Sequence, residues 1–253
     1  MKRILVLLLI LTFPSSWAEV AKPSQTAETK CGDWARLTFP DFYVENNVWG
    51  KRDITDYKQC IFRADKVFGW EWTWPSGAPD VVAYPEISFG WKPWNSQSTT
   101  PKLPLQVSKV KKALVTYDLS MKSEGIYNLA FDAWLTREPK PNEKNITAEI
   151  MIWLDHDTLK PDGSSSEAVT IDGETYDFYK GQPPHAEWPY LAFIKKTPRI
   201  SGKTDFRKFL DYLVRAKHVS PNDYLASIEF GNEVYSGTGK TEVKKYVVEI
   251  GKR

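Results

Sequence analysis

Glu149 lies in a segment whose alternating side chains suit a catalytic strand. Positions 148, 150, 152 and 154 are aliphatic, whereas Glu149, Met151 and Trp153 carry a carboxylate, a thioether and an indole. Successive side chains of a strand point to opposite faces, so these three share one face. A face open to water rarely carries Met and Trp beside a Glu. The pattern therefore favours a cleft over an ordinary solvated sheet face.

Two further acidic residues have similar surroundings. Glu233 ends a run in which Ile228 and Phe230 point toward the core, and Asp132 alternates with core positions such as Phe131. Hydrolysis of a glycosidic bond needs one carboxyl group that protonates the leaving oxygen and a second that attacks the anomeric carbon or activates water. Glu149, Glu233 and Asp132 are candidates for this chemistry, although spacing alone leaves a non-catalytic role open.

The elements that must position these residues are mostly strands. Alternation of period two recurs along the chain, and Asp172-Gly173 between two strand-like runs predicts a tight hairpin. Further strands are expected near 40–49, 59–67, 82–90, 110–120, 190–196 and 242–250. One segment near 204–217 has helical spacing of its apolar residues, with Thr204 or Asp205 as the N-cap. The pattern predicts an all-β fold, a two-sheet β-jelly-roll sandwich with one amphipathic helix.

The N-terminus predicts export. Residues 1–18 combine Lys2 and Arg3, an apolar run of ten residues and a small-x-small site that ends at Ala18, as in a secretory signal peptide. The run is too short for a spanning helix, which makes a retained membrane anchor the weaker alternative. We expect a flexible leader at 19–30 and one domain at 31–253. Cys31 and Cys60 predict one disulfide, as expected of a protein that is secreted to the extracellular space or the periplasm.

Charge and aromatic content point to a neutral polysaccharide partner. Without Lys2 and Arg3 the chain has 34 − 2 = 32 basic residues against 32 acidic ones, so a nucleic-acid partner is not expected. Aromatic clusters beside polar residues suit the flat faces of sugar rings, although core packing explains most tryptophans. These clusters are Trp70–Trp74, Trp91–Trp94 and Trp188–Tyr190. We expect a monomer that has no membrane contact after signal cleavage.

From about Cys31 onward the chain resembles glycoside hydrolase family 12, the jelly-roll endoglucanases and xyloglucanases. Five motifs carry the resemblance: Cys31-Gly-Asp-Trp34, Asn46-Asn-Val-Trp-Gly50, Ala130-Phe-Asp132, Glu149-Ile-Met-Ile-Trp-Leu154 and Phe230-Gly-Asn-Glu233. The resemblance implies that Glu149 is the nucleophile, Glu233 the acid/base and Asp132 the support of the nucleophile. It also implies that Trp34, Asn47 and Trp49 line the negative subsites, with Met151 beside the reacting sugar.

The implied activity is that of a retaining endo-β-1,4-glucanase acting on β-glucan through a covalent glycosyl-enzyme. That mechanism predicts carboxyl groups about 5–5.5 Å apart. It also predicts a raised pKa for Glu233 and a Glu149 that hydrogen bonds keep ionised. Val234-Tyr235 and the segment Tyr84–Trp91 depart from the family pattern, which leaves substrate preference open.

Three alternatives compete with this interpretation. A xyloglucan-specific endo-β-1,4-glucanase would share the site, and a non-catalytic carbohydrate-binding sandwich would share the fold without needing two opposed glutamates. A metal-dependent sugar oxidase is disfavoured, because the predicted mature chain begins at Glu19 rather than at a histidine. The segment Asp155-His-Asp157 lacks the ligand spacing of a calcium loop, so we expect no metal and no cofactor.

Overall fold

The computed structural model describes residues 27–183 and 186–252. The predicted signal peptide and residues 19–26 of the predicted leader lie outside this part of the chain. Within it, no helix is both long and apolar enough to cross a membrane.

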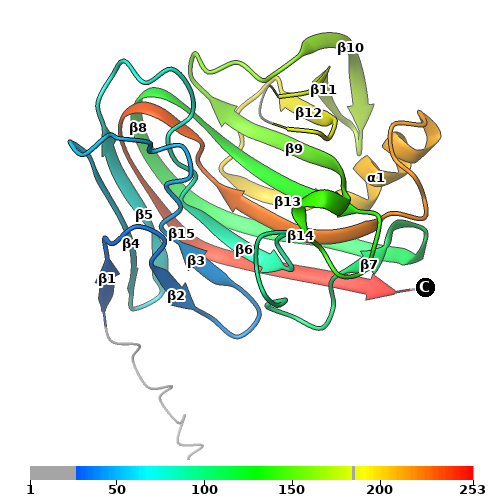
Figure 1. The fold of residues 1–253 in the computed structure, drawn as a ribbon, viewed down its shortest axis with the longest axis horizontal. Coiled ribbons are helices and arrows are strands. Elements are labelled where there is room, and N and C mark those ends of the chain that lie inside the picture. The colour runs from blue at the N-terminus through cyan, green and yellow to red at the C-terminus, as the bar shows by residue number, and fades with distance from the viewer. Residues whose placement is uncertain (1–26, 184–185, 253) are drawn as a thin grey trace, which may run out of the picture.

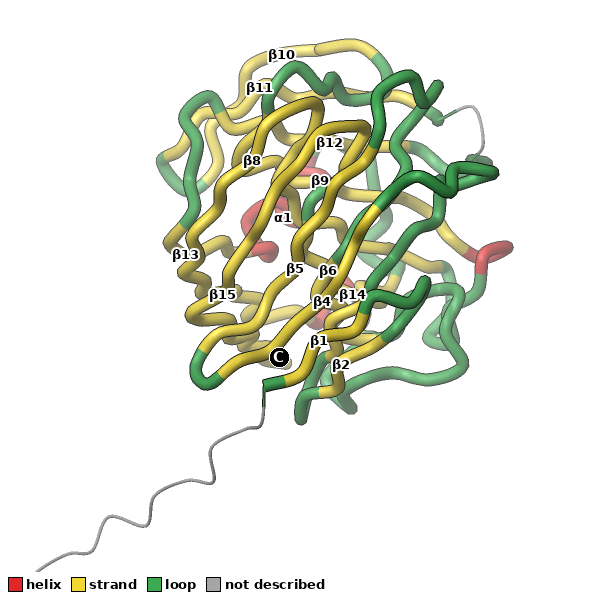
Figure 2. The backbone as a smooth tube through the Cα atoms, turned by 90° about the vertical axis from the view of Figure 1, so that its left-hand side faces the viewer, coloured by secondary structure: helices red, strands yellow, loops and turns green. Residues whose placement is uncertain are grey.

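Two packed sheets form the molecule (Figure 1). The outer sheet contains, in spatial order, β1 (Glu28–Lys30), β4 (Lys58–Ala64), β5 (Val67–Trp74), β15 (Val234–Lys252), β8 (Val110–Thr136) and β13 (Ser201–Asp205). Four of these strands, β4, β5, β15 and β8, run side by side in Figure 2.

The second sheet, which we call the cleft sheet, shares β8 with the first. Its order is β2 (Arg36–Thr38), β3 (Tyr43–Glu45), β6 (Glu86–Gly90), β14 (Tyr224–Gly231), β8, β9 (Ile146–His156), β12 (Tyr190–Lys195), β11 (Glu174–Gly181) and β10 (Ser164–Ile171). Strand β7 (Leu105–Gln106) pairs with β14, and the short helices η1 (Val107–Lys109) and η2 (Glu143–Asn145) precede β8 and β9. All neighbours are antiparallel except β9 and β12.

Strand β8 passes from one sheet to the other near Gly125. Gly125 has φ 111° and lies opposite Gly237, which has φ 99°. A Cβ at Gly237 would lie 2.1 Å from the carbonyl oxygen of Glu124. Only glycine tolerates both this backbone conformation and this close approach, so the pair lets β8 and β15 turn together.

The core lies between the sheets and follows the predicted alternation. Ile150, Ile152 and Leu154 of β9 pack into it, whereas Met151 and Trp153 face the other way. The helix α1 (Phe206–Arg215) begins at its N-cap Asp205, whose carboxylate accepts a hydrogen bond from Arg207 N at 3.1 Å. The predicted sandwich with one helix is confirmed.

Aromatic rings anchor the helix to the sheets. Phe206 packs edge-on against Phe131 of β8 at 5.3 Å, and Phe209 packs edge-on against Phe193 of β12 at 5.0 Å. The hairpin between β10 and β11 turns at Asp172 and Gly173, which both have positive φ. This is the conformation that the Asp-Gly pair predicts.

The first described strand begins three residues before the predicted domain boundary at residue 31. Glu28–Lys30, which the composition placed in the leader, form β1 against β4. The ion pair of Glu28 with Arg63 at 2.6 Å and the disulfide between Cys31 and Cys60 hold this strand. The disulfide is the predicted one.

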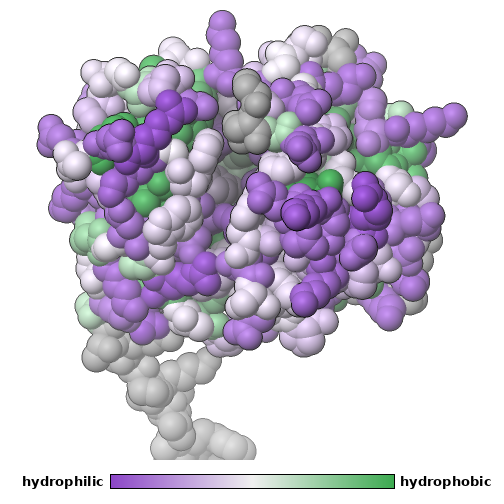
Figure 3. All heavy atoms as spheres, viewed as in Figure 1, coloured by the Kyte–Doolittle hydropathy of each residue, from purple (hydrophilic) through white to green (hydrophobic). Residues whose placement is uncertain are grey.

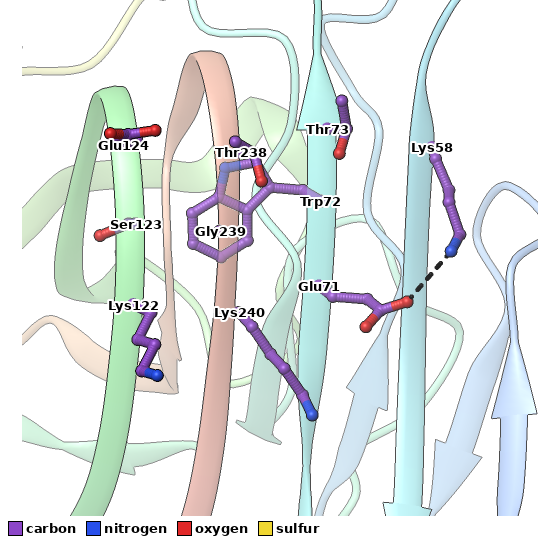
Figure 4. A pocket seen from close by; sticks show the side chains of 10 residues that line it. All are labelled: Lys58, Glu71, Trp72, Thr73, Lys122, Ser123, Glu124, Thr238, Gly239 and Lys240. Atoms are coloured by element: carbon purple, nitrogen blue, oxygen red, sulfur yellow. Dashed lines mark ion pairs between the residues drawn. The ribbon is translucent and has the colours of Figure 1, made fainter.

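Charged and polar side chains cover the outer face of β5, β15 and β8. Figure 4 shows a shallow pocket there, in which Lys58 and Glu71 form an ion pair at 3.3 Å. Gly239 has no side chain, and the Trp72 ring lies against it. Figure 3 shows that hydrophilic residues also dominate the face seen in Figure 1. The outer face of this sheet is thus exposed to solvent, and its apolar side chains lie on the opposite face, against the core.

Removing the disulfide should destabilise the fold, because the unfolded chain then gains conformational entropy. We expect the C31S/C60S variant to lose about 3–4 kcal/mol of unfolding free energy, the loop-entropy value for a loop of about 30 residues. Urea denaturation of the variant and of the oxidised wild type measures this difference, with a thiol assay to verify oxidation. A loss below about 1 kcal/mol would show that β1 is held by its pairing alone.

Candidate active site

A cleft of about 550 Å³ lies on the face of the cleft sheet that is turned away from the core. All seven residues predicted to act on substrate line it, although they come from distant parts of the chain. These are Trp34, Asn47, Trp49, Asp132, Glu149, Met151 and Glu233. Strand alternation places Asp132, Glu149 and Met151 on this face, whereas Trp34, Asn47, Trp49 and Glu233 reach the cleft from loops and turns.

Glu149 lies on β9, opposite Trp134 of β8 and Tyr190 of β12. Trp188 Nε1 donates a hydrogen bond to its carboxylate Oε2 at 2.9 Å. Burial raises the pKa of Glu149 to about 7, and the hydrogen bond from Trp188 opposes this rise. Glu149 is thus a desolvated carboxyl group with one indole donor that stabilises its anion.

Glu233 lies outside a strand, which differs from the prediction. β14 ends at Gly231 and β15 begins at Val234, so Glu233 sits in the connection between them. Its backbone N donates to Asn128 Oδ1 at 3.0 Å, and its backbone O accepts from Asn128 N at 3.0 Å. Asn128 Nδ2 also donates to the Glu233 carboxylate. This threefold contact with β8 replaces the strand as the support of the side chain.

The pKa values of the two glutamates are ordered as predicted, but Glu149 differs from the expectation. Burial first, and the charge of Glu149 second, raise the pKa of Glu233 to about 8. The pKa of Glu149 is raised too, because one hydrogen bond does not offset its burial among Met151, Trp134 and Trp188. As the pH rises, Glu149 therefore loses its proton before Glu233 does, although the two pKa values lie close together.

Asp132 lies between Glu229 of β14 and Met151 of β9 in the sheet register. Burial, followed by the charge of Glu149, raises its pKa well above the usual value. Its Oδ1 is buried and has no hydrogen-bond partner within the described residues, and no hydrogen bond joins it to Glu149. Asp132 is therefore a buried carboxyl group whose pKa is raised and which has one oxygen open to a new partner in the cleft.

Exposed indoles line the cleft. Trp34, Trp49 and Trp94 expose 50%, 43% and 48% of their surface, values that few large apolar side chains in the described residues reach. Asn47 Oδ1 accepts a hydrogen bond from Trp49 N at 3.0 Å, and Asn47 Nδ2 donates to Glu86 Oε1 at 2.9 Å. Rings left open to water beside polar groups can stack on sugar rings.

Sequence reasoning missed several residues of this cleft. Trp94 packs edge-on against Trp134 at 4.9 Å, and Trp188 holds Glu149. Both lie in aromatic clusters that the sequence had singled out, so a signal existed for them. Asn128 shares strand parity with Asp132, which was a weaker signal. Lys92 lies in the Trp91–Trp94 cluster, but nothing in the sequence indicated its ion pairs with Glu86 and Glu229.

The family profile described as glycosyl hydrolase family 12 matches residues 40–251. The chain belongs to glycosyl hydrolase family 12. This family 12 chain is 32% identical to Endoglucanase S of Pectobacterium parmentieri over 89% of its own length and 88% of the relative's. It is 26% identical to the xyloglucan-specific endo-beta-1,4-glucanase A of Emericella nidulans, over 87% and 90% of the two chains.

Solved structures support the same assignment. The family 12 xyloglucanase from Bacillus licheniformis superposes with a TM-score of 0.83 and 32% sequence identity, and the match covers 88% of this chain and 100% of that one. The Cel12A endoglucanase from Rhodothermus marinus gives a TM-score of 0.79 at 26% identity. The protein is a glycoside hydrolase with a polysaccharide substrate, as the sequence predicted.

The electrostatic contact between the two glutamates can be measured directly. Because the charge of Glu149 raises the pKa of Glu233, the E149Q variant should lower the pKa of Glu233 below about 8. The value should stay above that of a free glutamate, since burial remains. NMR titration of labelled carboxyl carbons measures the shift, and the exposed-site variant E249Q should leave it unchanged. An unchanged pKa in E149Q would mean that the two groups do not face each other.

Proposed function

We propose that the protein is a secreted, retaining endo-β-1,4-glucanase that hydrolyses internal β-1,4-glucosidic bonds. One observation carries the proposal: Glu149 of β9 and Glu233 of the β14–β15 connection line the same cleft, both partly buried, and the charge of Glu149 raises the pKa of Glu233. Two carboxyl groups in one cleft with different pKa values are what acid and nucleophile chemistry at one bond requires. A protein that only binds sugars has no need for such a pair.

The proposed reaction has two steps. Glu149 attacks the anomeric carbon as a carboxylate while Glu233 gives its proton to the departing glycosidic oxygen. Glu233, now ionised, then takes a proton from water as that water releases the sugar from Glu149. The reactive state, Glu149 ionised and Glu233 protonated, is most populated between pH values of about 7 and 8, the pKa values of the two groups.

The remaining cleft residues receive roles that fit their exposure. Trp34, Asn47 and Trp49 would form the negative subsites, with the half-exposed indoles as stacking surfaces. Met151 is buried next to Glu149 and would contact the reacting sugar as a soft apolar surface. Asp132 would support the nucleophile: ionisation of Glu149 raises the pKa of Asp132, which favours a proton shared between the two carboxyl groups.

Export is part of the proposal. It rests on the signal-like segment 1–18 and on the disulfide between Cys31 and Cys60, which forms in oxidising compartments.

Xyloglucan is a second candidate substrate. The relatives named above include an endoglucanase and a xyloglucanase, and the chain is 32% identical to one of each kind. Initial rates on carboxymethylcellulose, mixed-linkage β-glucan and xyloglucan separate the two. We expect the unbranched substrates to be cleaved faster. A rate on xyloglucan at least tenfold above both would assign the enzyme to the xyloglucan-specific type.

Substrates with different leaving groups can distinguish the roles of the two glutamates. We expect E149Q to lose activity on every substrate. E233Q should lose about 10²- to 10⁴-fold on β-glucan but much less on an aryl glycoside whose phenolate leaves without a proton. Steady-state kinetics on both substrates measures this, with E143Q as a control for a carboxyl group elsewhere on the cleft wall. Equal losses for E233Q on both substrates would remove Glu233 from the acid role.

A further inference from the structure

A buried ionic cluster lies under the floor of the cleft. Lys92, in the loop after β6, places Nζ 2.5 Å from Glu86 Oε1 and 3.2 Å from Glu229 Oε2. Both carboxyl groups are fully buried, and Lys92 exposes only 9% of its surface. Burying charges is costly unless they are paired. The catalytic chemistry described above uses none of these three groups, so their presence requires another explanation.

The cluster is joined to the residues that flank the catalytic pair. Glu229 Oε2 accepts a hydrogen bond from Trp134 Nε1 at 3.2 Å, and Trp134 lies opposite Glu149 in the sheet register. Glu229 itself lies opposite Asp132. On the other side, Glu86 Oε1 accepts a hydrogen bond from Asn47. One ammonium group thus connects a proposed sugar-binding residue to the neighbours of the nucleophile.

The cleft carries many more acids than bases. Among the described residues that line it, the acidic ones are Glu45, Asp132, Glu143, Glu149, Glu229 and Glu233. The basic ones are Arg36 and Lys92, and Arg36 forms an ion pair with Glu45 at 2.5 Å. Arg36 is also far more exposed than Lys92, so water screens its charge. Lys92 is therefore the buried cation that acts on the acids of the floor.

We propose that Lys92 is an electrostatic positioning residue for Glu149: its ammonium group under the floor favours the carboxylate that attacks the sugar. The negative charge of Glu229 opposes this effect, so Glu229 sets how far Lys92 lowers the pKa of Glu149. The inference rests on the proposed function, because it takes Glu149 as the nucleophile.

The charged neighbours of Glu149 shift its pKa in the directions that the inference requires. Burial is the main cause of its raised pKa; Glu229 raises this pKa further, whereas Lys92 lowers it. The pKa of Asp132 responds to Glu229 and Lys92 in the same two directions. Among the described residues, the titratable groups that act on Glu149 or are acted on by it include Lys92, Asp132, Asp162, Tyr190, Glu229 and Glu233.

The pH dependence of kcat/KM on soluble β-glucan tests the inference through shifts of opposite sign. E229Q removes the negative charge that opposes Lys92. The pKa of Glu149 should therefore fall, and the acidic limb should move to lower pH. K92M removes the cation, so this limb should move to higher pH. Each shift should be at most about one pH unit, the order of magnitude expected when one partly screened charge near a carboxyl group is removed. A purely structural role would lower kcat/KM at every pH without moving the limb in opposite directions.

Two surface variants serve as matched controls. K102M removes a lysine of the same loop that pairs with the exposed Asp41, and E249Q removes an exposed glutamate of β15. Neither should move the limb. K92M leaves Glu86 and Glu229 without a cation and can fail to fold, but E229Q keeps the Lys92–Glu86 pair and tests the inference by itself. An acidic limb that stays in place or moves to higher pH in E229Q would overturn the inference.

Failure of this inference can be told from failure of the proposed function. If E149Q keeps wild-type activity, Glu149 is not the nucleophile, and the proposed function fails whatever Lys92 does. If E149Q is inactive and the acidic limb of E229Q does not fall, only the role of Lys92 is wrong.

Discussion

The free-energy cost of holding carboxyl groups out of water governs the structure of the cleft. The described lining contains more acids than bases, and its acidic side chains have partners of several kinds. Glu149 accepts a hydrogen bond from Trp188, Glu233 is held by Asn128, and Glu229 pairs with Lys92. Asp132 forms no ion pair within the described residues, its Oδ1 has no hydrogen-bond partner there, and its pKa is raised well above the usual value. The pKa shifts of Glu149, Glu233 and Asp132 thus depend on burial and on the partner that each carboxyl group meets.

These contacts depend on the sandwich for their precision. Strand β8 is part of both sheets, and its cleft-facing positions include Asn128, Asp132 and Trp134. The core rings of Phe131 and Phe230 stack at 4.3 Å directly behind this face. Packed aromatic cores resist displacement, so the cleft face has a rigid support. The Gly125 and Gly237 pair, where β8 changes sheet, makes this shared strand feasible.

Much of this arrangement could be predicted from local sequence. Alternation placed Glu149 and Met151 on the cleft face, and the helical spacing and the Asp-Gly pair gave α1 and the β10–β11 hairpin. Contacts between distant segments could not be predicted. The composition of residues 28–30 is that of a leader, and only their pairing with β4 identifies them as a strand. Likewise, the hydrogen bonds between Glu233 and Asn128 of β8, which hold Glu233 outside a strand, join segments far apart in the sequence. Lys92 becomes a cleft residue only when the fold brings it to Glu229.

The most direct test of the account is to trap the covalent intermediate. A 2-deoxy-2-fluoro cello-oligosaccharide with an activated leaving group should form a stable glycosyl-enzyme, because the fluorine slows its hydrolysis more than its formation. Peptide mass spectrometry should then locate one sugar ester on Glu149, and the E149Q variant should remain unlabelled. An ester on another carboxyl group, or rapid turnover without any ester, would contradict the assignment of Glu149 as the nucleophile.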